Sequence, residues 1–390
     1  MDTAQFSSKR AGRIQGQVTG YQAFIPVSLP PSPALHMDAE CLTLLSQADR
    51  SLGRLNGLAS IITDPDLFVY LYVRKEALLS SQIEGTQCSL EDVLVDFEPK
   101  TQNSSDDIEE VSNYVAAMNE GLARLQEIPI STRLIREMHG VLMRGVRGHA
   151  KSPGEFRNSQ NWIGPPNAPL SAAQFVPPPP DDAKQAMSEL EKYIHEDDSL
   201  PPLVKAALVH AQFETIHPFL DGNGRLGRLL ITFVLCNWKV MEKPLLYLSY
   251  FFKANRTEYY ARLMAIRTKG DWESWVKFFL RGVHETAQMA NQAALDIHAL
   301  HQRDNEKIRS SRANPSVAQV FHAFCRFPVA TINDLLKAIP NSNTMTLNRS
   351  VKSLVTQGIL KQVGTNQRNR RFVYPAYMEI LTRDTITKIG

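Results

Sequence analysis

The chain contains the stretch His-Pro-Phe-Leu-Asp-Gly-Asn-Gly-Arg-Leu-Gly-Arg at residues 217–228. A helical pattern ends near Phe213 and a second begins near Gly224, so a short turn leading into a helix is expected. A helix N-terminus binds anions, because its free N–H groups and the positive end of its dipole point to the same place. Arg225 and Arg228 lie three positions apart on that helix and add guanidinium groups suited to phosphate oxygens. The stretch therefore predicts a phosphate-binding site.

Other residues of the stretch predict chemistry at that phosphate. Gly222 and Gly224 let backbone N–H groups approach a ligand closely, because they have no Cβ. Asp221 would repel a phosphate by itself, but it is suited to Mg²⁺, which binds through one or two carboxylates together with phosphates. His217 is the residue of the turn suited to proton transfer near neutral pH. Together these features indicate nucleotidyl or phosphoryl transfer to a hydroxyl, and a structural loop with a buried histidine is the alternative.

The same residues resemble the signature of the Fic family, written H-P-F-x-[DE]-G-N-G-R-x-x-R, at every specified position. The resemblance implies transfer of AMP from ATP to a Ser, Thr or Tyr hydroxyl of a protein. His217 would deprotonate the hydroxyl, and Asp221 would hold Mg²⁺ between the α- and β-phosphates. The related Doc kinases carry Lys in place of Gly224, which argues against kinase chemistry here. The nucleotide ligands that the resemblance implies are Gly222, Asn223, Gly224, Arg225, Arg228, Tyr259 and Tyr260.

The last two of these residues resemble the family's tyrosine pair near the adenine pocket. Their rings could stack on a base, but a place in the hydrophobic core is an equal alternative for Tyr259 and Tyr260.

A second motif lies upstream, at the end of a helix expected over residues 67–83. Gly85 is typical of a left-handed helix cap, whereas Glu84 is unfavourable at the negative end of a helix dipole and needs a partner elsewhere. The string from Ser80 to Gly85 resembles [ST]-x-x-x-E-[GN], the inhibitory motif of Fic proteins. The resemblance implies that Glu84 pairs with Arg228 and so inhibits AMP transfer within the same chain. In some relatives the same glutamate serves AMP removal from a target, and that alternative stays open.

Composition and pattern predict several parts in a chain of 390 residues. The expected fold is mainly α: a Fic-type helical core with a β-hairpin flap and a C-terminal winged helix-turn-helix domain. The expected parts are an N-terminal extension packing on the body (1–36), a helical region with the inhibitory helix (37–107), the Fic catalytic core (108–300) and the winged-helix domain (312–390). Within the extension, residues 1–20 are expected to be mobile.

The expected flap lies near Gln160–Phe175, between proline-rich turns. Two short extended segments around a loop indicate a hairpin. The resemblance implies that this hairpin positions the target's hydroxyl segment by strand addition, which needs only main-chain hydrogen bonds.

Residues 312–390 have a different charge from the rest of the chain. They carry eleven Lys or Arg and three Asp or Glu, a net charge of +8, although the whole chain has a net charge of only +3. This asymmetry is typical of nucleic-acid binding, and Arg349, Lys352, Arg368, Arg370 and Arg371 are the candidate contacts. A docking or dimerisation module with a solvated basic wing is the alternative.

Two functions therefore compete: an autoinhibited protein adenylyltransferase, and a DNA-binding regulator whose core senses a nucleotide. The intact His217 favours the enzyme, because sensing alone needs no base. Four scattered cysteines indicate a reducing compartment. Without a signal peptide or a span long enough to cross a membrane, a cytoplasmic protein without membrane contact is expected, and a homodimer is compatible with the sequence.

Overall fold

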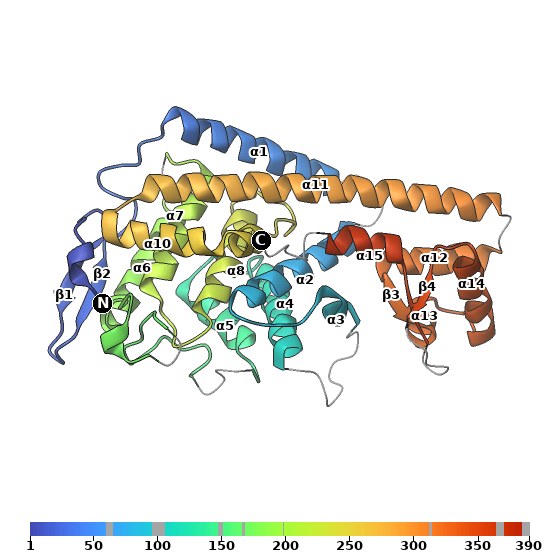
Figure 1. The fold of residues 1–390 in the computed structure, drawn as a ribbon, viewed down its shortest axis with the longest axis horizontal. Coiled ribbons are helices and arrows are strands. Elements are labelled where there is room, and N and C mark those ends of the chain that lie inside the picture. The colour runs from blue at the N-terminus through green and yellow to red at the C-terminus, as the bar shows by residue number, and fades with distance from the viewer. Residues whose placement is uncertain are drawn as a thin grey trace.

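The computed structural model describes residues 1–59, 65–95, 106–146, 151–165, 168–197, 199–311, 314–363 and 370–383. It is mainly α-helical, as the sequence predicts (Figure 1). Among the described residues, no helix combines the length and apolar character needed to cross a membrane.

The N-terminal half contains five helices before the flap among the described residues: α1 (Ala39–Ala59), α2 (Pro65–Ile83), α3 (Leu90–Val95), α4 (Asp106–Arg124) and α5 (Thr132–Leu142). The central helices follow it: α6 (Pro180–His195), α7 (Pro202–Ile216), α8 (Asn223–Asn237), α9 (Ser249–Ala254), α10 (Arg256–Lys269) and α11 (Trp272–Ser310). The last helices are α12 (Pro315–Arg326), α13 (Ile332–Ala338), α14 (Thr344–Thr356) and α15 (Pro375–Thr382). The strands are β1 (Gly12–Gly16), β2 (Gln22–Pro26), β3 (Val329–Thr331), β4 (Lys361–Val363) and β5 (Arg371–Val373).

Helix α7 is the centre of the body, and it positions the 217–228 stretch. Every residue from Leu203 to Ile216 is buried, because α6, α8, α10 and α11 all pack against this helix. Trp275 of α11 is fully buried and donates from Nε1 to the carbonyl of Ala207 at 2.8 Å. Burial of a large apolar side chain contributes about 1.5–3 kcal/mol, so α7 and α8 form a fixed support for the turn between them.

Helix α11 runs along the length of the molecule and joins the body to the C-terminal helices (Figure 1). Its 39 residues correspond to about 58 Å at 1.5 Å per residue. Its first part packs along α1, where Asn291 donates to the carbonyl of Ser51 at 3.0 Å. Its last part meets α12 and α15. The predicted core boundary at residue 300 thus falls inside one continuous helix, and the predicted division into four parts stays a prediction.

The N-terminal segment forms a hairpin, so the expectation of mobility for residues 1–20 was wrong. Strands β1 and β2 pair antiparallel from Gly12 opposite Pro26 to Gly16 opposite Gln22. The Phe24 ring packs against Phe175, with centroids 5.6 Å apart, and the Phe24 N–H donates to Val176 at 2.9 Å. Strand β1 has no apolar alternation that would predict it, because Ile14 is its one large apolar residue and most of the strand is exposed. The hairpin instead gains its support from the segment around Phe175.

The predicted flap near Gln160–Phe175 is a loop closed by one antiparallel bridge between Ile163 and Phe175. Its described residues contain a 3-10 turn at Leu170–Ala172 and no paired strands. Pro165 and Pro169 lie between the two predicted segments and have no N–H to donate, which works against a longer ladder. The expected hairpin is therefore reduced to a single bridge.

The C-terminal elements follow the predicted order of helix, helix, helix and hairpin. Thr331 caps α13 in a reciprocal capping box with Asp334. Strand β5 pairs with both β3 and β4. The assignment to the winged-helix class stays a prediction, and Arg368 of the predicted wing lies outside the described residues.

One C-terminal helix was missed by the sequence analysis. Helix α15 packs on α11. Just before it, the buried Tyr374 hydroxyl donates to Asp304 of α11 at 2.6 Å. This contact fastens the C-terminal elements to the long helix.

Candidate active site

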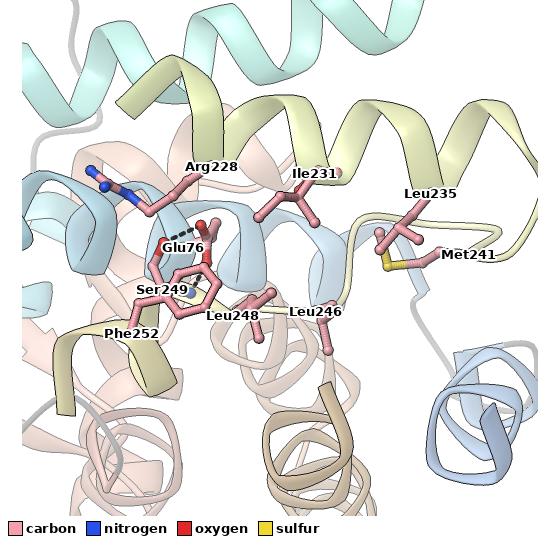
Figure 2. Close-up of a pocket in the computed structure, with 10 residues that line it drawn as sticks. Glu76, Arg228, Ile231, Leu235, Met241, Leu246, Leu248, Ser249 and Phe252 are labelled. Atoms are coloured by element: carbon pink, nitrogen blue, oxygen red, sulfur yellow. Dashed lines mark hydrogen bonds between the residues drawn. The ribbon is translucent and has the colours of Figure 1, made fainter. Parts of the chain in front are cut away.

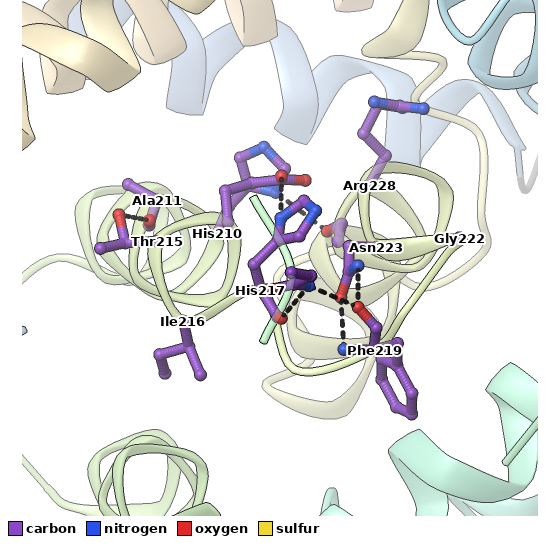
Figure 3. Close-up of polar contacts among 12 residues, drawn as sticks. His210, Ala211, Thr215, Ile216, His217, Phe219, Gly222, Asn223 and Arg228 are labelled. Atoms are coloured by element: carbon purple, nitrogen blue, oxygen red, sulfur yellow. Dashed lines mark hydrogen bonds and ion pairs between the residues drawn. The ribbon is translucent and has the colours of Figure 1, made fainter. Parts of the chain in front are cut away.

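His217 ends α7 in the left-handed conformation, with φ 51° and ψ 59° (Figure 3). Such a conformation is uncommon for a residue with a Cβ and needs support. The His217 N–H donates to the carbonyl of Phe213 at 2.9 Å. Its carbonyl accepts from Arg157 Nε at 2.9 Å and from Asn161 Nδ2 at 3.1 Å. These bonds from Arg157 before the flap and Asn161 at its start fix the direction in which the imidazole leaves the backbone.

Asn223 closes the turn between α7 and α8 (Figure 3). Its Oδ1 accepts from the Phe219 N–H at 2.9 Å and its Nδ2 donates to the Phe219 carbonyl at 2.8 Å. The side chain is buried, and both of its polar atoms are used inside the turn. The side chain of Asn223 therefore shapes the loop, while its backbone N–H is suited to a phosphate, and its contact with a nucleotide stays a prediction.

His139 of α5 is a site residue that the sequence analysis missed. Its ring stacks on Phe219, with centroids 3.8 Å apart. The Gly154 N–H donates to His139 Nδ1 at 2.8 Å, so Nε2 carries the proton and donates to the Asp221 carbonyl at 3.0 Å. His139 thus holds the backbone of the turn at Asp221, the residue just before Gly222. No sequence signal links these residues, because they are 82 positions apart.

Gly222 is needed both for its left-handed backbone conformation and because the surrounding side chains leave no room for a Cβ. It caps α8 with φ 75°, and a Cβ there would lie 2.7 Å from Met143 Sδ and 3.3 Å from His139 Nε2. We expect Gly222→Ala to lower the free energy of unfolding by at least about 1–2 kcal/mol, because a left-handed residue with a Cβ is strained by that amount before any clash. Urea unfolding monitored by circular dichroism measures the change.

Gly57 offers the matched control. It is exposed on α1, and a Cβ added there would have no heavy atom within 4 Å. Gly57→Ala is expected to stabilise by roughly 0.5–1 kcal/mol, since alanine favours a helix interior. Equal unfolding energies for the two variants would contradict the role given to Gly222.

The electrostatic surroundings of His217 favour its neutral form. Its side chain is 20% exposed. Burial, followed by the positive charges of Arg267 and Arg157, lowers the pKa of His217 below its usual range. A neutral imidazole can accept a proton at neutral pH. The His217 Nδ1 atom is buried without a hydrogen-bond partner among the described residues, and Oε2 of Glu214 lies 4.0 Å from it.

Arg225 occupies the first turn of α8 and is buried. Its Nη1 lies 3.5 Å from Oε2 of Glu110, and its Nη2 lies 3.4 Å from Met143 Sδ. Its Nε and Nη1 have no hydrogen-bond acceptor within the described part of the chain. Arg225 is thus ion-paired with Glu110, but two of its buried donors at a helix N-terminus make no hydrogen bond, which indicates a site for an anion.

Arg228 lies one turn further along α8 and binds the end of α2. Its Nε donates to Ser80 Oγ at 2.8 Å, and its Nη2 donates to the Ser80 carbonyl at 3.0 Å and to Glu84 Oε1 at 2.7 Å. Burial opposes the charge of Arg228, but Glu84 outweighs this and raises its pKa. The predicted pair between Glu84 and Arg228 is thus present in the structure.

Gly224 makes room for this pair. A Cβ there would lie 2.4 Å from Glu84 Oε1 and 3.1 Å from Arg228 Nη1. The Glu84 carboxylate therefore lies over the N-terminus of α8, where the sequence predicts a phosphate. Gly85 follows with φ 107°, which supports its predicted role at the helix end. The next residue, Thr86, donates to Oε2 of Glu110 at 2.8 Å, so the same segment also reaches the partner of Arg225.

The buried polar side chains of Glu76 and Ser249 lie below Arg228 (Figure 2). The buried Glu76, two turns before Glu84 on α2, accepts from the N–H and hydroxyl of Ser249 and from the Tyr114 hydroxyl. Burial raises the pKa of Glu76 to about 7. Glu76, Ser80 and Glu84 recur every four residues, so one face of α2 is turned toward Arg228.

Asp221, the predicted metal ligand, forms an ion pair with Lys151, and its role toward a metal stays a prediction. Its Oδ1 accepts from the Gly222 N–H at 2.8 Å, and its Oδ2 is 2.9 Å from Lys151 Nζ. Burial opposes ionisation, but the Lys151 contacts outweigh it and lower the pKa of Asp221. Within the described ranges, no group of three His, Cys, Asp or Glu residues could hold a metal. One ionised carboxylate beside a phosphate site does fit Mg²⁺, which takes its other ligands from phosphates and water.

The tyrosine pair is divided between core and surface. Tyr259 is 1% exposed, stacks on Phe252 with centroids 4.5 Å apart, and hydrogen-bonds His210 at 2.9 Å through its hydroxyl. This burial favours the core alternative for Tyr259, and its predicted contact with a nucleotide is not tested by the structure. Tyr260 is 42% exposed, with the Arg256 guanidinium 5.5 Å from its ring centroid, and its predicted contact with a base stays a prediction.

Comparison with known proteins identifies the class to which this site belongs. Residues 42–123 match the Fic/DOC family N-terminal region, and residues 129–235 match the Fic/DOC family itself. The two matches together span residues 42–235, so this part of the chain is similar to the Fic/DOC family.

Individual relatives agree with this assignment. The protein adenylyltransferase Fic of Drosophila virilis is 31% identical over 203 residues, which cover 50% of this chain and 38% of the relative. Its Drosophila melanogaster counterpart is 30% identical over 177 residues, covering 44% and 32%. The chain thus spans less than half the length of these curated relatives. The crystal structure of a Fic family protein from Desulfovibrio desulfuricans has a TM-score of 0.57 and 22% identity, covering 87% of this chain and 97% of that one, which shows the shared fold.

Proposed function

We propose that the protein transfers AMP from ATP to a Ser, Thr or Tyr hydroxyl of a protein target. The observation that carries the proposal is the buried guanidinium of Arg225 in the first turn of α8, with two donors that lack an acceptor among the described residues. An oligophosphate supplies the anionic oxygens that these donors need. The family relatives named as protein adenylyltransferases support the same reaction.

In this reaction His217 takes the proton of the target hydroxyl as the oxygen attacks the α-phosphorus. A bond forms between that oxygen and the α-phosphorus, and the bond between the α-phosphorus and the bridging oxygen breaks, so pyrophosphate leaves. The first N–H groups of α8 and Arg225 stabilise the negative charge that builds on the phosphate oxygens. Asp221 would hold Mg²⁺, which when bound neutralises part of the charge of the phosphates.

The inhibitory role of Glu84 belongs to the same proposal. Its carboxylate lies over the first turn of α8 and binds Arg228, so it competes with the terminal phosphate of ATP for the same cation. A buried charge pair persists only when its geometry offsets the loss of hydration, and the two bonds from Arg228 to Ser80 supply part of that geometry.

The target hydroxyl would approach across the flap. The single bridge between Ile163 and Phe175 and the exposed Trp162 beside it leave this segment at the surface. An extended target segment can bind such an edge through main-chain hydrogen bonds.

The test uses full-length protein, Mg²⁺ and ATP labelled either at the α- or at the γ-phosphate. The expected result is label on the chain itself or on a lysate protein from α-labelled ATP only. Label from γ-labelled ATP would indicate phosphoryl transfer instead. Loss of AMP from a previously modified protein would support the alternative of AMP removal at the same site.

We also propose that the C-terminal elements bind DNA. Arg349 and Lys352 of α14 and Arg370 beside β5 line a groove whose nine lining residues include no carboxylate. We expect R349E/K352E to weaken binding of a DNA duplex about tenfold or more. The slope of log affinity against log salt concentration should become shallower by the amount that corresponds to roughly two phosphate contacts. Fluorescence anisotropy at several salt concentrations measures both quantities.

Lys184 is the control for this prediction, because it is an exposed lysine on α6. K184E should bind the duplex like the unchanged protein. Unchanged binding by R349E/K352E would favour the alternative of a protein-docking module. Self-association stays a prediction from the sequence, and light scattering of the full chain tests it.

A further inference from the structure

We propose that Glu214 is a positioning residue for His217: its buried carboxylate holds the Nδ1 proton of the imidazole and stabilises the imidazolium formed during AMP transfer. The inference rests on the proposed function and adds a residue outside the 217–228 stretch. Glu214 lies one turn before His217 on α7, so both side chains leave the helix on nearly the same side.

Each of these two side chains has a buried polar atom without a partner. Among the described residues, His217 Nδ1 and Glu214 Oε1 are both buried without a hydrogen-bond partner. The distance between His217 Nδ1 and Glu214 Oε2 is 4.0 Å, longer than a hydrogen bond. Catalytic hydrogen bonds are often long in the absence of substrate and shorten in the reacting complex. Unpaired buried polar atoms are costly, so closing this gap gives His217 Nδ1 the partner that it lacks.

The fold makes room for the carboxylate at this place. A Cβ at Gly227 would lie 2.6 Å from Glu214 Oε1 and 3.1 Å from a Phe213 ring carbon. Helix α8 therefore approaches α7 closely at Gly227, and the carboxylate occupies the space of the missing side chain. Glu214 is 6% exposed, so water screens its charge weakly and its effect on a neighbouring imidazolium is strong.

Charged groups from several elements act on this carboxyl. Burial raises the pKa of Glu214 to about 7, Arg228 of α8 and Arg267 of α10 oppose this, and Glu84 at the end of α2 adds to it. After burial, the same carboxyl is the largest influence that raises the pKa of Tyr259 of α10. Removing Glu84 therefore favours the ionised form of Glu214. His217 and Glu214 titrate as a pair, so the pH dependence belongs to both.

The proton route follows from this geometry. The buried Nδ1 keeps its proton and points toward Glu214, so Nε2 is the nitrogen that takes the proton of the target hydroxyl. The imidazolium then carries protons on both nitrogens, with the carboxylate beside one of them. The proton returns from Nε2 to solvent after pyrophosphate has left, and the ionised Glu214 carboxylate does not take it.

The experiment compares E84G, E84G/E214Q and E84G/E76Q in full-length protein, with AMP transfer measured from about pH 6 to about pH 8. In E84G/E214Q we expect kcat to fall about 100-fold, the KM for ATP to stay unchanged, and the acidic limb of the pH profile to disappear. E84G/E76Q is the matched control, because Glu76 is a second buried carboxyl whose pKa is raised to about 7, and it should keep that limb.

Each outcome is decisive. A kcat in E84G/E214Q within twofold of E84G, or an acidic limb that survives in it, overturns the proposal. If E84G/E214Q does not fold, the profile of E84G itself decides, because a rate independent of pH excludes a titrating carboxylate partner. E84G that binds ATP but transfers no AMP contradicts the proposed function, and this inference with it.

Discussion

His217→Ala is expected to lower the rate of AMP transfer about 100- to 10,000-fold, the range that a general base contributes. The imidazole is held by its left-handed backbone and by the bonds from Arg157 and Asn161 to its carbonyl. These contacts use the backbone, so they survive the substitution. Transfer of label from α-phosphate-labelled ATP measures the rate, and calorimetry should show unchanged ATP affinity.

Two further variants keep this prediction sharp. His217→Asn removes the base with a residue that tolerates the left-handed conformation, so its loss of rate cannot be ascribed to a strained turn. His322→Ala removes an exposed histidine of α12 and should retain full activity. Transfer by both His217 variants at the unchanged rate would show that another group accepts the proton.

The sequence predicted the site best where a residue conflicts with its local surroundings. Glu84 is unfavourable at the end of a helix, and this conflict pointed to a distant cation, which the structure shows to be Arg228 at 2.7 Å. The resemblance supplied the identity of that cation. Gly224 was assigned to close approach of a backbone N–H, and the structure adds that its missing Cβ leaves room for the Glu84 carboxylate.

Contacts between distant segments could not be read from the sequence. His139 supports the turn from α5, and Arg157 supports it from the segment before the flap. Neither residue has a local pattern that indicates such a role. The helices were predicted well because their apolar spacing is a local signal, whereas β1 and the shortened flap depend on packing against residues far away in the chain.

Asn223 and Tyr259 show a second limit. A motif states which residue type is required, but not whether its side chain faces the ligand or the fold. Asn223 uses both polar atoms on Phe219, and Tyr259 is enclosed with His210 and Phe252. Glu214 is the converse case, since no motif marks it and only the fold brings its carboxylate to His217.

Glu84→Gly is expected to raise AMP transfer at least about tenfold. A hydrogen bond to a charged group contributes about 1.5–3 kcal/mol, and partial exposure of Glu84 places this pair toward the lower end. Each 1.4 kcal/mol changes an equilibrium about tenfold. Loss of the Glu84–Arg228 bond therefore raises the ratio of open to inhibited protein by at least that factor. Initial rates with α-labelled ATP at low and saturating concentrations measure the gain.

The same substitution should have an opposite effect on stability, and this contrast tests the physical basis of the inhibition. Arg228 is 2% exposed, and without Glu84 its charge stays buried without the carboxylate that it binds directly, which lowers the melting temperature in the absence of nucleotide. ATP supplies a new counter-charge and should raise the melting temperature of Glu84→Gly more than that of the unchanged protein. E84G/R228A should lose the gain in activity, because the cation that Glu84 releases is then absent. Equal activity of Glu84→Gly and the unchanged protein, together with equal stabilisation by ATP, would show that this ion pair supports the fold without restraining the reaction.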